Sequence, residues 1–181
     1  FSATMPRPIL NLAKRYQKNP MHIEIARKEM TVEKIDQSYI SVRSFHKVEL
    51  LSRLLVRDDI HLALVFCNTK KCVEEVVTQL QARGFTAAGL HGDMRQIERD
   101  AIMARYRQGS VAVLVATDVA ARGLDIENIE AVFNYDVPQD VEYYVHRSGR
   151  TGRAGKAGKA YTFVVGREVA RMWEYRKITG A

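Results

Sequence analysis

The stretch LALVFC at residues 62–67 contains six apolar residues in succession and is followed at once by the polar run Asn68-Thr69-Lys70. A strand buried on both faces of a parallel sheet has this continuous apolar character, whereas a half-buried strand alternates. Beyond the polar run, apolar residues recur at helical spacing until Gly84, where a glycine can adopt the left-handed conformation that ends a helix. The stretch therefore predicts the first part of a strand–helix–strand unit.

The same alternation continues on both sides of this unit. Further strands are expected at 35–42, 85–90, 111–116, 131–135 and 160–165. Apolar residues at helical spacing predict helices around 48–55, 72–80, 97–106 and 141–146, and a last helix from about Glu168. Because strands and helices alternate, we predict an α/β fold in which a parallel β-sheet is flanked by helices on both faces. In open sheets of this kind, ligands bind beyond the carboxyl ends of the strands.

The segment ahead of the predicted sheet has a different pattern. A helix is expected from about Pro8 to Lys18, followed by a short strand at 22–25 and a polar linker at 27–33. The compact domain is predicted to begin near Ile35. Because the chain starts at Phe1 and not at a methionine, we expect it to be a piece of a longer protein.

Composition limits the function classes. The 181-residue chain has a length suited to one domain, and its net charge of +7 favours an anionic partner. No apolar run approaches the ~20 residues of a transmembrane helix, so no membrane partner is expected. Cys67 lies in an apolar run and Cys72 opens a helical pattern, which predicts reduced core thiols and argues against a disulfide or a metal pair. The cytoplasm is therefore the expected location.

Hydroxyl, glycine and arginine residues follow four of the predicted strands, where a site is expected. They are Asn68-Thr69-Lys70, His91-Gly92-Asp93 with Gln96 and Arg99, Thr117-Asp118 with Arg122-Gly123-Leu124-Asp125, and Asp136. Each also has a purely structural interpretation. Thr69 is a suitable helix N-cap, and Thr117 and Asp118 are suitable turn residues. Gln96 and Arg99 suit the solvent-facing side of a helix. Their coincidence at four strand ends favours a functional edge.

The octet HRSGRTGR at 146–153 holds His146, Arg147, Arg150 and Arg153 within eight residues. Its arginines are three residues apart and are separated by residues too small to shield them. Guanidinium groups bind phosphate oxygens bidentately and stay charged at physiological pH, so the octet predicts an anion site. A solvated basic loop is the alternative interpretation.

Together these segments resemble the later motifs of the DEAD-box RNA helicases, in the family's order. The resemblance spans the whole chain, and the stretch from Asn134 to Lys156 is most similar to bacterial members. It rests on Ser2-Ala3-Thr4, LVFCNTK (64–70), HGD (91–93) with Gln96 and Arg99, ATDVAARGLD (116–125) and HRSGRTGR. The family has two RecA-like domains. The resemblance implies that residues 1–33 are the tail of the N-terminal helicase domain with the interdomain linker, and that 34–181 form the C-terminal RecA-like domain.

The resemblance also implies roles at an ATP site. Arg150 and Arg153 match the arginine fingers that approach the γ-phosphate of ATP, and His146 matches a residue that relays between the ATP-binding and RNA-binding motifs. Asp125 matches a residue near the ribose, and Gly123 matches a glycine that permits close approach of the chain.

Other matched residues imply RNA binding and coupling between domains. Contacts to the RNA backbone, independent of RNA sequence, are implied for Thr69, Gly92, Arg99 and Thr117, with Asp118 nearby. Interdomain coupling is implied for Ser2, Thr4, Gln96 and Arg147.

The 181 residues contain no GxxxxGK[ST] phosphate loop and no Asp-Glu-Ala-Asp run. We therefore expect ATP with Mg²⁺ to be held mainly by the N-terminal RecA-like domain of the full-length protein, and this chain alone to bind no cofactor tightly. The predicted function is the C-terminal half of an ATP-dependent RNA helicase that couples ATP hydrolysis to duplex unwinding. Two alternatives stay open: a non-catalytic module that binds RNA or a protein, and a DNA helicase of the same superfamily.

Overall fold

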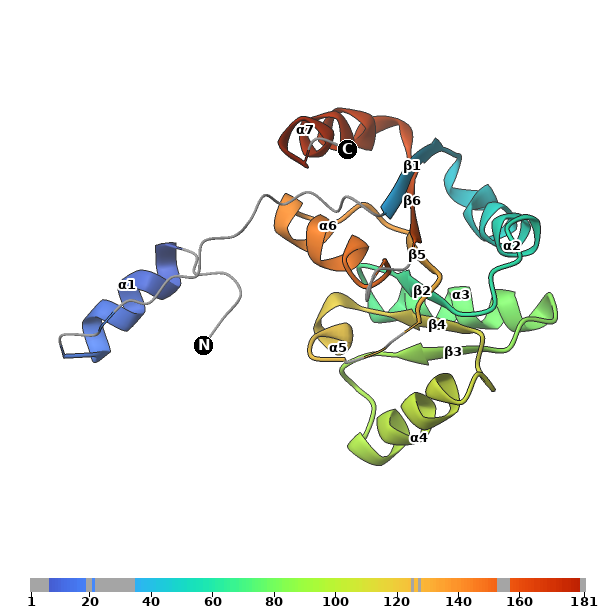
Figure 1. Cartoon of the computed structure of the whole chain (residues 1–181), viewed down its shortest axis with the longest axis horizontal. Helices are drawn as coiled ribbons and strands as arrows, with labels where there is room; N and C mark the ends of the chain where they lie inside the picture. The colour runs from blue at the N-terminus through green and yellow to red at the C-terminus, as the bar shows by residue number, and fades with distance from the viewer. Residues whose placement is uncertain are drawn as a thin grey trace.

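The computed structural model describes residues 7–18, 21, 35–124, 126, 128–152 and 157–179. The predicted short strand at 22–25 and the predicted linker at 27–33 lie outside these residues. The α-helices and strands of the described residues are α1 (Arg7–Tyr16), β1 (Ile35–Ser41), α2 (Lys47–Arg57), β2 (Ala63–Phe66), α3 (Lys70–Ala82), β3 (Ala87–Leu90), α4 (Gln96–Arg107), β4 (Val113–Ala116), α5 (Asp118–Ala121), β5 (Ala131–Asn134), α6 (Val141–Ser148), β6 (Gly158–Val164) and α7 (Val169–Thr179) (Figure 1).

The strands form one six-stranded sheet in the order β1-β6-β5-β2-β4-β3, and every neighbouring pair is parallel. The predicted α/β fold is therefore confirmed. The apolar stretch that begins at Leu62 supplies β2, which lies between β5 and β4 in the interior of the sheet. All four of its residues are buried, as expected for a strand covered on both faces.

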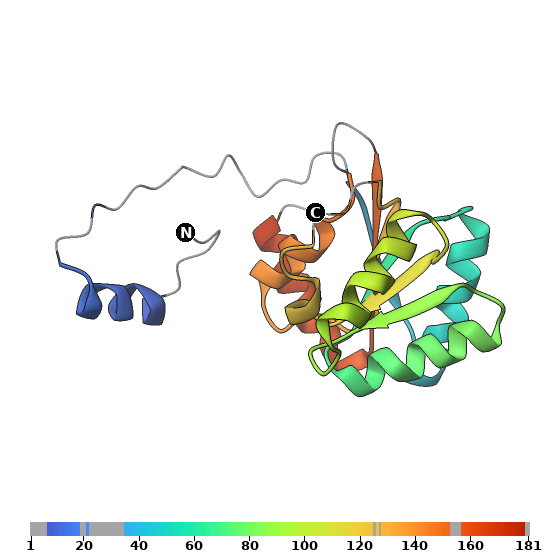
Figure 2. The same ribbon diagram turned by 90° about the horizontal axis from the view of Figure 1, so that it is seen from below.

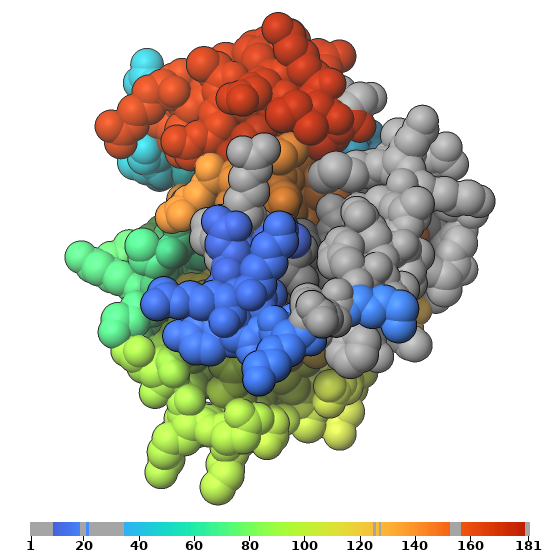
Figure 3. Space-filling model, turned by 90° about the vertical axis from the view of Figure 1, so that its left-hand side faces the viewer, coloured from blue at the N-terminus to red at the C-terminus, as the bar shows by residue number. Residues whose placement is uncertain are grey.

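Helices cover both faces of the sheet. On one face, α2 and α3 pack against Val65 of β2 through apolar side chains such as Leu51 and Leu80. On the other face, α4 and α5 pack against Leu64 and Phe66, and α6 and α7 form a further apolar cluster. Figure 2 shows α6 and α7 across the sheet from α2, and Figure 3 shows a face with α7 (red) above α6 (orange) and α4 (yellow-green). Burying each large apolar side chain contributes about 1.5–3 kcal/mol, so these two layers stabilise the sheet.

Glycines end two of the helices as predicted. Gly84 follows α3 with φ +85°, and Gly109 follows α4 with φ +75°. A residue with a Cβ would be strained in this left-handed conformation, so glycine fixes where each helix stops.

The apolar face of α4 was partly mispredicted from the sequence. Ile97 is 81 % exposed and Ala101 is also exposed, whereas Met103 and Tyr106 are buried. The Tyr106 hydroxyl donates a hydrogen bond of 2.9 Å to the Ala63 carbonyl oxygen. The helix therefore faces the sheet with a side that carries a tyrosine, because that tyrosine finds a backbone partner inside the core.

One boundary and one helix also differ from the prediction. The first helix ends at Tyr16 and not at Lys18. Residues after Thr117, predicted only as a turn, form the short helix α5, whose N-cap is Thr117. Among the described residues, every helix is too short or too polar to cross a bilayer.

Candidate functional site

The carboxyl ends of four neighbouring strands meet at one edge of the sheet. Phe66 of β2 is aligned with Ala116 of β4 and Asn134 of β5, and Ala116 is aligned with Leu90 of β3. The loops after these residues therefore start at the same level. Thr117 N donates to the Leu90 carbonyl oxygen at 3.3 Å, which joins two of them directly.

Arg147 lies beneath this edge, and its side chain is only 1 % exposed. Its Nε and one terminal nitrogen each donate to an Asp118 carboxylate oxygen at 2.6 Å, which forms a bidentate ion pair. The guanidinium also donates to the Asp136 carbonyl oxygen at 2.8 Å and to Asn68 Oδ1 at 2.9 Å. It lies over the Phe66 ring, with Cζ 5.1 Å from the ring centroid. Arg147 thus ties α6 to the loops after β2, β4 and β5.

Asp136 extends these connections with its side chain. One of its carboxylate oxygens accepts from the Asn68 backbone N–H at 3.0 Å, and the other accepts from Lys47 Nζ at 3.2 Å. Lys47 also donates to the Tyr135 carbonyl oxygen at 2.7 Å and is itself buried. We call Asn68, Asp118, Asp136, Arg147 and Lys47 the Arg147 cluster. Its two cations face two carboxylates, so the buried charges are paired.

Thr69 and Thr117 both act as helix N-caps. Thr69 Oγ1 accepts from Cys72 N at 3.2 Å at the start of α3, and Thr117 Oγ1 accepts from Ala120 N at 3.4 Å at the start of α5. The capping interpretation of Thr69 is thus confirmed. An N-cap hydroxyl accepts a hydrogen bond and still has its own O–H to donate, so capping and phosphate binding are compatible.

The other residues implied for RNA binding or coupling surround these caps. Gly92 is exposed, and a Cβ at this position would meet no atom within 4 Å. Arg99 is half-buried and donates to the Ala120 carbonyl oxygen at 3.2 Å, which brings α4 beside α5. Gln96 is exposed and bonds Asp100 on its own helix at 2.7 Å.

Lys70 and Asp93 form an exposed ion pair between the loops after β2 and β3. The hydrogen bond from the Lys70 ammonium lowers the pKa of Asp93, and Asp93 raises the pKa of Lys70. Both groups therefore keep their charges across the physiological pH range.

Of the residues implied for ATP binding, Gly123, His146 and Arg150 are described, and they lie on the α5–α6 side of the edge. A pocket of about 40 Å³ is lined by Phe66, Asp118, Ala121, Arg122, Tyr143, His146, Arg147 and Arg150. Arg150 donates to the Leu124 carbonyl oxygen at 3.3 Å. Gly123 has φ +75°, so the turn after α5 needs the freedom of glycine. A pocket this small is far below the ≈ 300 Å³ of a typical small-molecule site, as expected for one wall of a site.

The structure brings together Thr69, Gly92, Arg99, Thr117, Asp118, His146, Arg147 and Arg150 at one edge. Ser2, Thr4, Asp125 and Arg153 lie outside the described residues, and their roles stay predictions. Arg147 bonds Asn68, Asp118, Asn134 and Asp136, all within this domain, so its implied interdomain role also stays a prediction. Asp118, which the resemblance places near the RNA contacts, uses both carboxylate oxygens to accept hydrogen bonds from Arg147.

Sequence reasoning missed Lys47 and Asn134 as members of this edge. Lys47 opens an amphipathic helix, where a lysine is ordinarily solvated, and nothing in the sequence signals that it reaches Tyr135 and Asp136. Asn134 is buried in β5, and its Nδ2 donates to Thr162 Oγ1 at 3.0 Å. A polar residue in an otherwise apolar strand was the available signal.

Comparison with known proteins agrees with this architecture. Residues 46–155 match the family model described as the helicase conserved C-terminal domain. The chain is 52% identical over 168 residues to the DEAD-box ATP-dependent RNA helicase CshA of Bacillus licheniformis, covering 93% of this chain and 34% of that protein. It is 47% identical over 179 residues to the CshA of Geobacillus kaustophilus, covering 99% of this chain and 38% of that protein. The chain thus spans about a third of the length of these relatives.

Solved structures show the same fold. A DEAD-box protein from the hyperthermophile Methanococcus jannaschii matches with a TM-score of 0.75 and 40% identity, covering 99% of this chain and 48% of that one. S. cerevisiae Dbp5 bound to RNA and ADP BeF3 matches with a TM-score of 0.86 and 33% identity, again covering 99% and 48%. The chain therefore belongs to the helicase conserved C-terminal domain family, and the relatives that it matches are DEAD-box RNA helicases.

Proposed function

We propose that this chain is the C-terminal RecA-like half of an ATP-dependent RNA helicase. In this proposal it binds the RNA backbone and supplies arginine fingers to ATP that is held mainly by an N-terminal RecA-like domain of the same protein. The longer protein couples ATP binding and hydrolysis to RNA duplex unwinding. The single observation that carries the proposal is the Arg147 cluster.

The Arg147 cluster connects the proposed RNA side of the site to its ATP side, because Arg147 bonds residues that are next in sequence to the RNA-side threonines. Asn68 precedes Thr69, and Asp118 follows Thr117, so the guanidinium holds both capping threonines through their neighbours. His146 precedes Arg147 on α6, and Arg150 follows shortly after it. A displacement of α6 would therefore be transmitted to the RNA side through a contiguous network of hydrogen bonds.

On the RNA side, the available groups suit phosphates and not base edges. Two cap hydroxyls, an exposed glycine and Arg99 can donate to backbone oxygens, whereas the implied contact set contains no aromatic side chain on which bases could stack. The net charge of +7 favours such a polyanion. We therefore infer sequence-independent binding, with RNA preferred over DNA through its 2′-hydroxyl groups.

On the ATP side, the residues fit one wall of a phosphate site. Arg150 and Arg122 line the pocket and carry positive charge, and the turn at Gly123 allows the backbone to approach a ligand closely. Bound ATP with Mg²⁺ would supply the phosphoryl group and its charge neutralisation. The pocket carboxylate, Asp118, is bound bidentately by Arg147, so we assign the Mg²⁺ contacts to the N-terminal domain.

Interdomain roles for Ser2, Thr4, Gln96 and Arg147, and ribose and phosphate roles for Asp125 and Arg153, remain part of this proposal. So does a cytoplasmic location, which suits an RNA-binding protein whose Cys67 and Cys72 are unpaired thiols.

ATP hydrolysis by two forms of the protein tests the proposal. We expect the 181-residue chain alone to hydrolyse no ATP above background, and a protein that joins it to a complete N-terminal helicase domain to hydrolyse ATP when RNA is added. A non-catalytic binding module would leave both forms inactive. Equal stimulation by DNA and RNA of the same sequence would instead favour a DNA helicase. RNA-stimulated hydrolysis by the isolated chain would refute the half-site proposal.

A further inference from the structure

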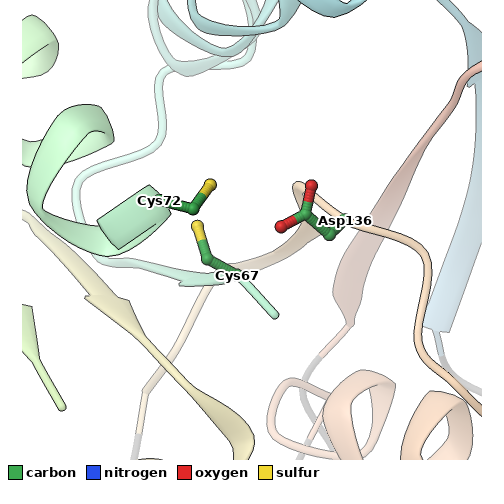
Figure 4. A group of neighbouring side chains, drawn as sticks. All are labelled: Cys67, Cys72 and Asp136. Atoms are coloured by element: carbon green, nitrogen blue, oxygen red, sulfur yellow. The ribbon is translucent and has the colours of Figure 1, made fainter. Parts of the chain in front are cut away.

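Two cysteines and a carboxylate lie together behind the loop that follows β2. Cys67 ends the apolar stretch, Cys72 lies in the first turn of α3, and Asp136 follows β5. The two sulfur atoms and one carboxylate oxygen are all within 4.8 Å of one another. Figure 4 shows the Cys67 sulfur pointing toward Cys72 and one carboxylate oxygen of Asp136 turned toward the two cysteines. Three separate segments of the chain thus present their ligand atoms to one point.

We propose that Cys67, Cys72 and Asp136 form a binding site for a soft divalent cation, with Zn²⁺ or Cd²⁺ as the matching ions. Thiolate sulfur selects such ions over Mg²⁺ and Ca²⁺, which prefer oxygen ligands alone. Zinc sites with three protein ligands keep an open fourth position, and here that position would hold water. The site is distinct from the pocket on the α5–α6 side that Arg150 lines.

The spacing of the ligand atoms fits this coordination. With Zn–S bonds of about 2.3 Å and Zn–O bonds of about 2.1 Å, tetrahedral ligand atoms lie roughly 3.5–3.8 Å apart. The observed separations of at most 4.8 Å would have to close by about 1 Å. Rotation of the half-buried Cys72 and Asp136 side chains can supply that movement, while Cys67 stays in the core.

The charges around the cluster also balance. Two thiolates and one carboxylate around a divalent ion give a net charge of −1, and Lys47 Nζ lies 3.2 Å from an Asp136 oxygen. The buried lysine would therefore neutralise the loaded site. Each carboxylate oxygen of Asp136 already accepts one hydrogen bond, from Lys47 or from the Asn68 N–H, and keeps a second lone pair for the ion.

Oxidation of the two thiols to a disulfide is the competing chemistry for this cluster. Forming a disulfide from two thiols needs an external two-electron oxidant. Metal binding needs none, because the ion replaces both thiol protons and releases two H⁺ as two metal–sulfur bonds form. The Asp136 carboxylate, which lies within 4.8 Å of both sulfur atoms, can serve as a metal ligand and has no part in a disulfide.

Titration of the reduced, metal-free 181-residue chain with Cd²⁺ tests the proposal. We expect a thiolate-to-cadmium charge-transfer absorption that saturates at about one ion per chain, and Zn²⁺ should displace the Cd²⁺. The thermal midpoint should rise with added Zn²⁺, because an ion that binds only the folded chain stabilises it. No absorption band, or a band without saturation near one ion, would overturn the proposal.

Variants locate the ion. Cys72→Ser keeps the size of a half-buried side chain and should weaken Cd²⁺ binding by more than about tenfold, with circular dichroism confirming the fold. Glu75→Gln is the matched control, since it removes an exposed carboxylate from the same helix and should leave the affinity unchanged. Unchanged binding in Cys72→Ser, or equal loss in Glu75→Gln, would overturn the assignment. Cys67 is fully buried, so a substitution there would disturb the core and would not separate loss of a ligand from loss of the fold.

Discussion

Both ends of the sheet carry a cluster of charged side chains, but the two clusters are assembled differently. At the carboxyl edge, Arg147 binds groups from three loops that are far apart in the sequence. Near the amino-terminal ends of the strands, Asp58 binds its neighbour Arg57, with Lys159 at 3.5 Å and the Tyr161 hydroxyl also in contact. Ion pairs alone therefore do not distinguish a functional end of this sheet from a structural one.

What distinguishes the two ends is the surroundings of each cluster. The Arg147 cluster adjoins two capping hydroxyls and the pocket that Arg150 lines. The Asp58 cluster joins the end of α2 to β6 through the contacts of Asp58 with Lys159 and Tyr161. We infer that the first cluster serves both stability and activity, and the second serves stability alone. Variants at the two ends of the sheet test this distinction.

The largest effect is expected from Arg150→Ala. In a protein that joins this chain to a complete N-terminal helicase domain, loss of an arginine finger should lower the rate of ATP turnover by on the order of 10³-fold or more. RNA affinity without nucleotide should fall little. Arg150→Lys should rescue poorly, because an ammonium cannot reproduce the bidentate fork. Arg153→Ala is expected to behave alike.

Steady-state ATPase kinetics measure this effect, with circular dichroism to confirm folding. Asp58→Asn is the matched control, since it disturbs the cluster at the other end of the sheet and should leave turnover near normal at a temperature where it is folded. Turnover within about tenfold of the parent in Arg150→Ala would show that this arginine is not a finger.

Arg147→Ala should cause the largest loss of stability. Removing one partner of a buried ion pair costs about 3–5 kcal/mol, because the remaining charge is left buried without compensation. Urea unfolding of the 181-residue chain measures the change. The double variant Arg147→Ala/Asp118→Ala should be less destabilised than the sum of the single variants, since it leaves no lone carboxylate. Strict additivity would mean that the ion pair contributes little.

Asp58→Asn should cost about 2 kcal/mol at pH 7, the scale of hydrogen bonds to a charged group. The hydrogen bond from Arg57, with Tyr161 and Lys159 nearby, holds the pKa of Asp58 well below its usual range. Because the folded-state pKa is lowered, the stabilisation is complete above the ordinary value of about 3.9 and is lost as pH falls below it. The difference between parent and variant should therefore shrink in acid. A difference in unfolding free energy that is constant down to pH 3 would contradict this.

Most of the fold could be predicted from the sequence because parallel strands that are buried on both faces leave uninterrupted apolar runs. LALVFC predicted β2, and Gly84 and Gly109 marked the ends of two helices. The exposed Ile97 was mispredicted because periodicity records which residues are apolar and not which side of a helix meets the sheet. Packing of Tyr106 against β2 decides that orientation, and it depends on residues remote in sequence.

The site could be predicted as a set of strand-end loops, but the hydrogen bonds and ion pairs among its side chains could not. Arg147 appeared as one more arginine of a basic octet, yet its side chain is buried, whereas Arg150 is half-buried. Which arginine turns inward depends on Asp118 and Asn68, which the sheet brings within reach. Likewise Asp136 joins Cys67 and Cys72 only in the folded chain, so sequence spacing gave no sign of three ligands.

The smallest effect, and the most specific one, is expected from Arg99→Ala. Arg99 bonds the Ala120 carbonyl oxygen, so it lies beside the α5 turn that Thr117 caps, where we place RNA phosphates. Losing one phosphate contact on a single strand should lower the slope of log affinity against log salt by about 0.7 and weaken unrelated RNA sequences equally. Arg105→Ala removes the same charge from the exposed last turn of α4 and is the matched control, with the slope unchanged. Equal slope changes in both variants would indicate long-range attraction only. A change in sequence preference at constant slope would place Arg99 against a base, contrary to the proposed backbone contact.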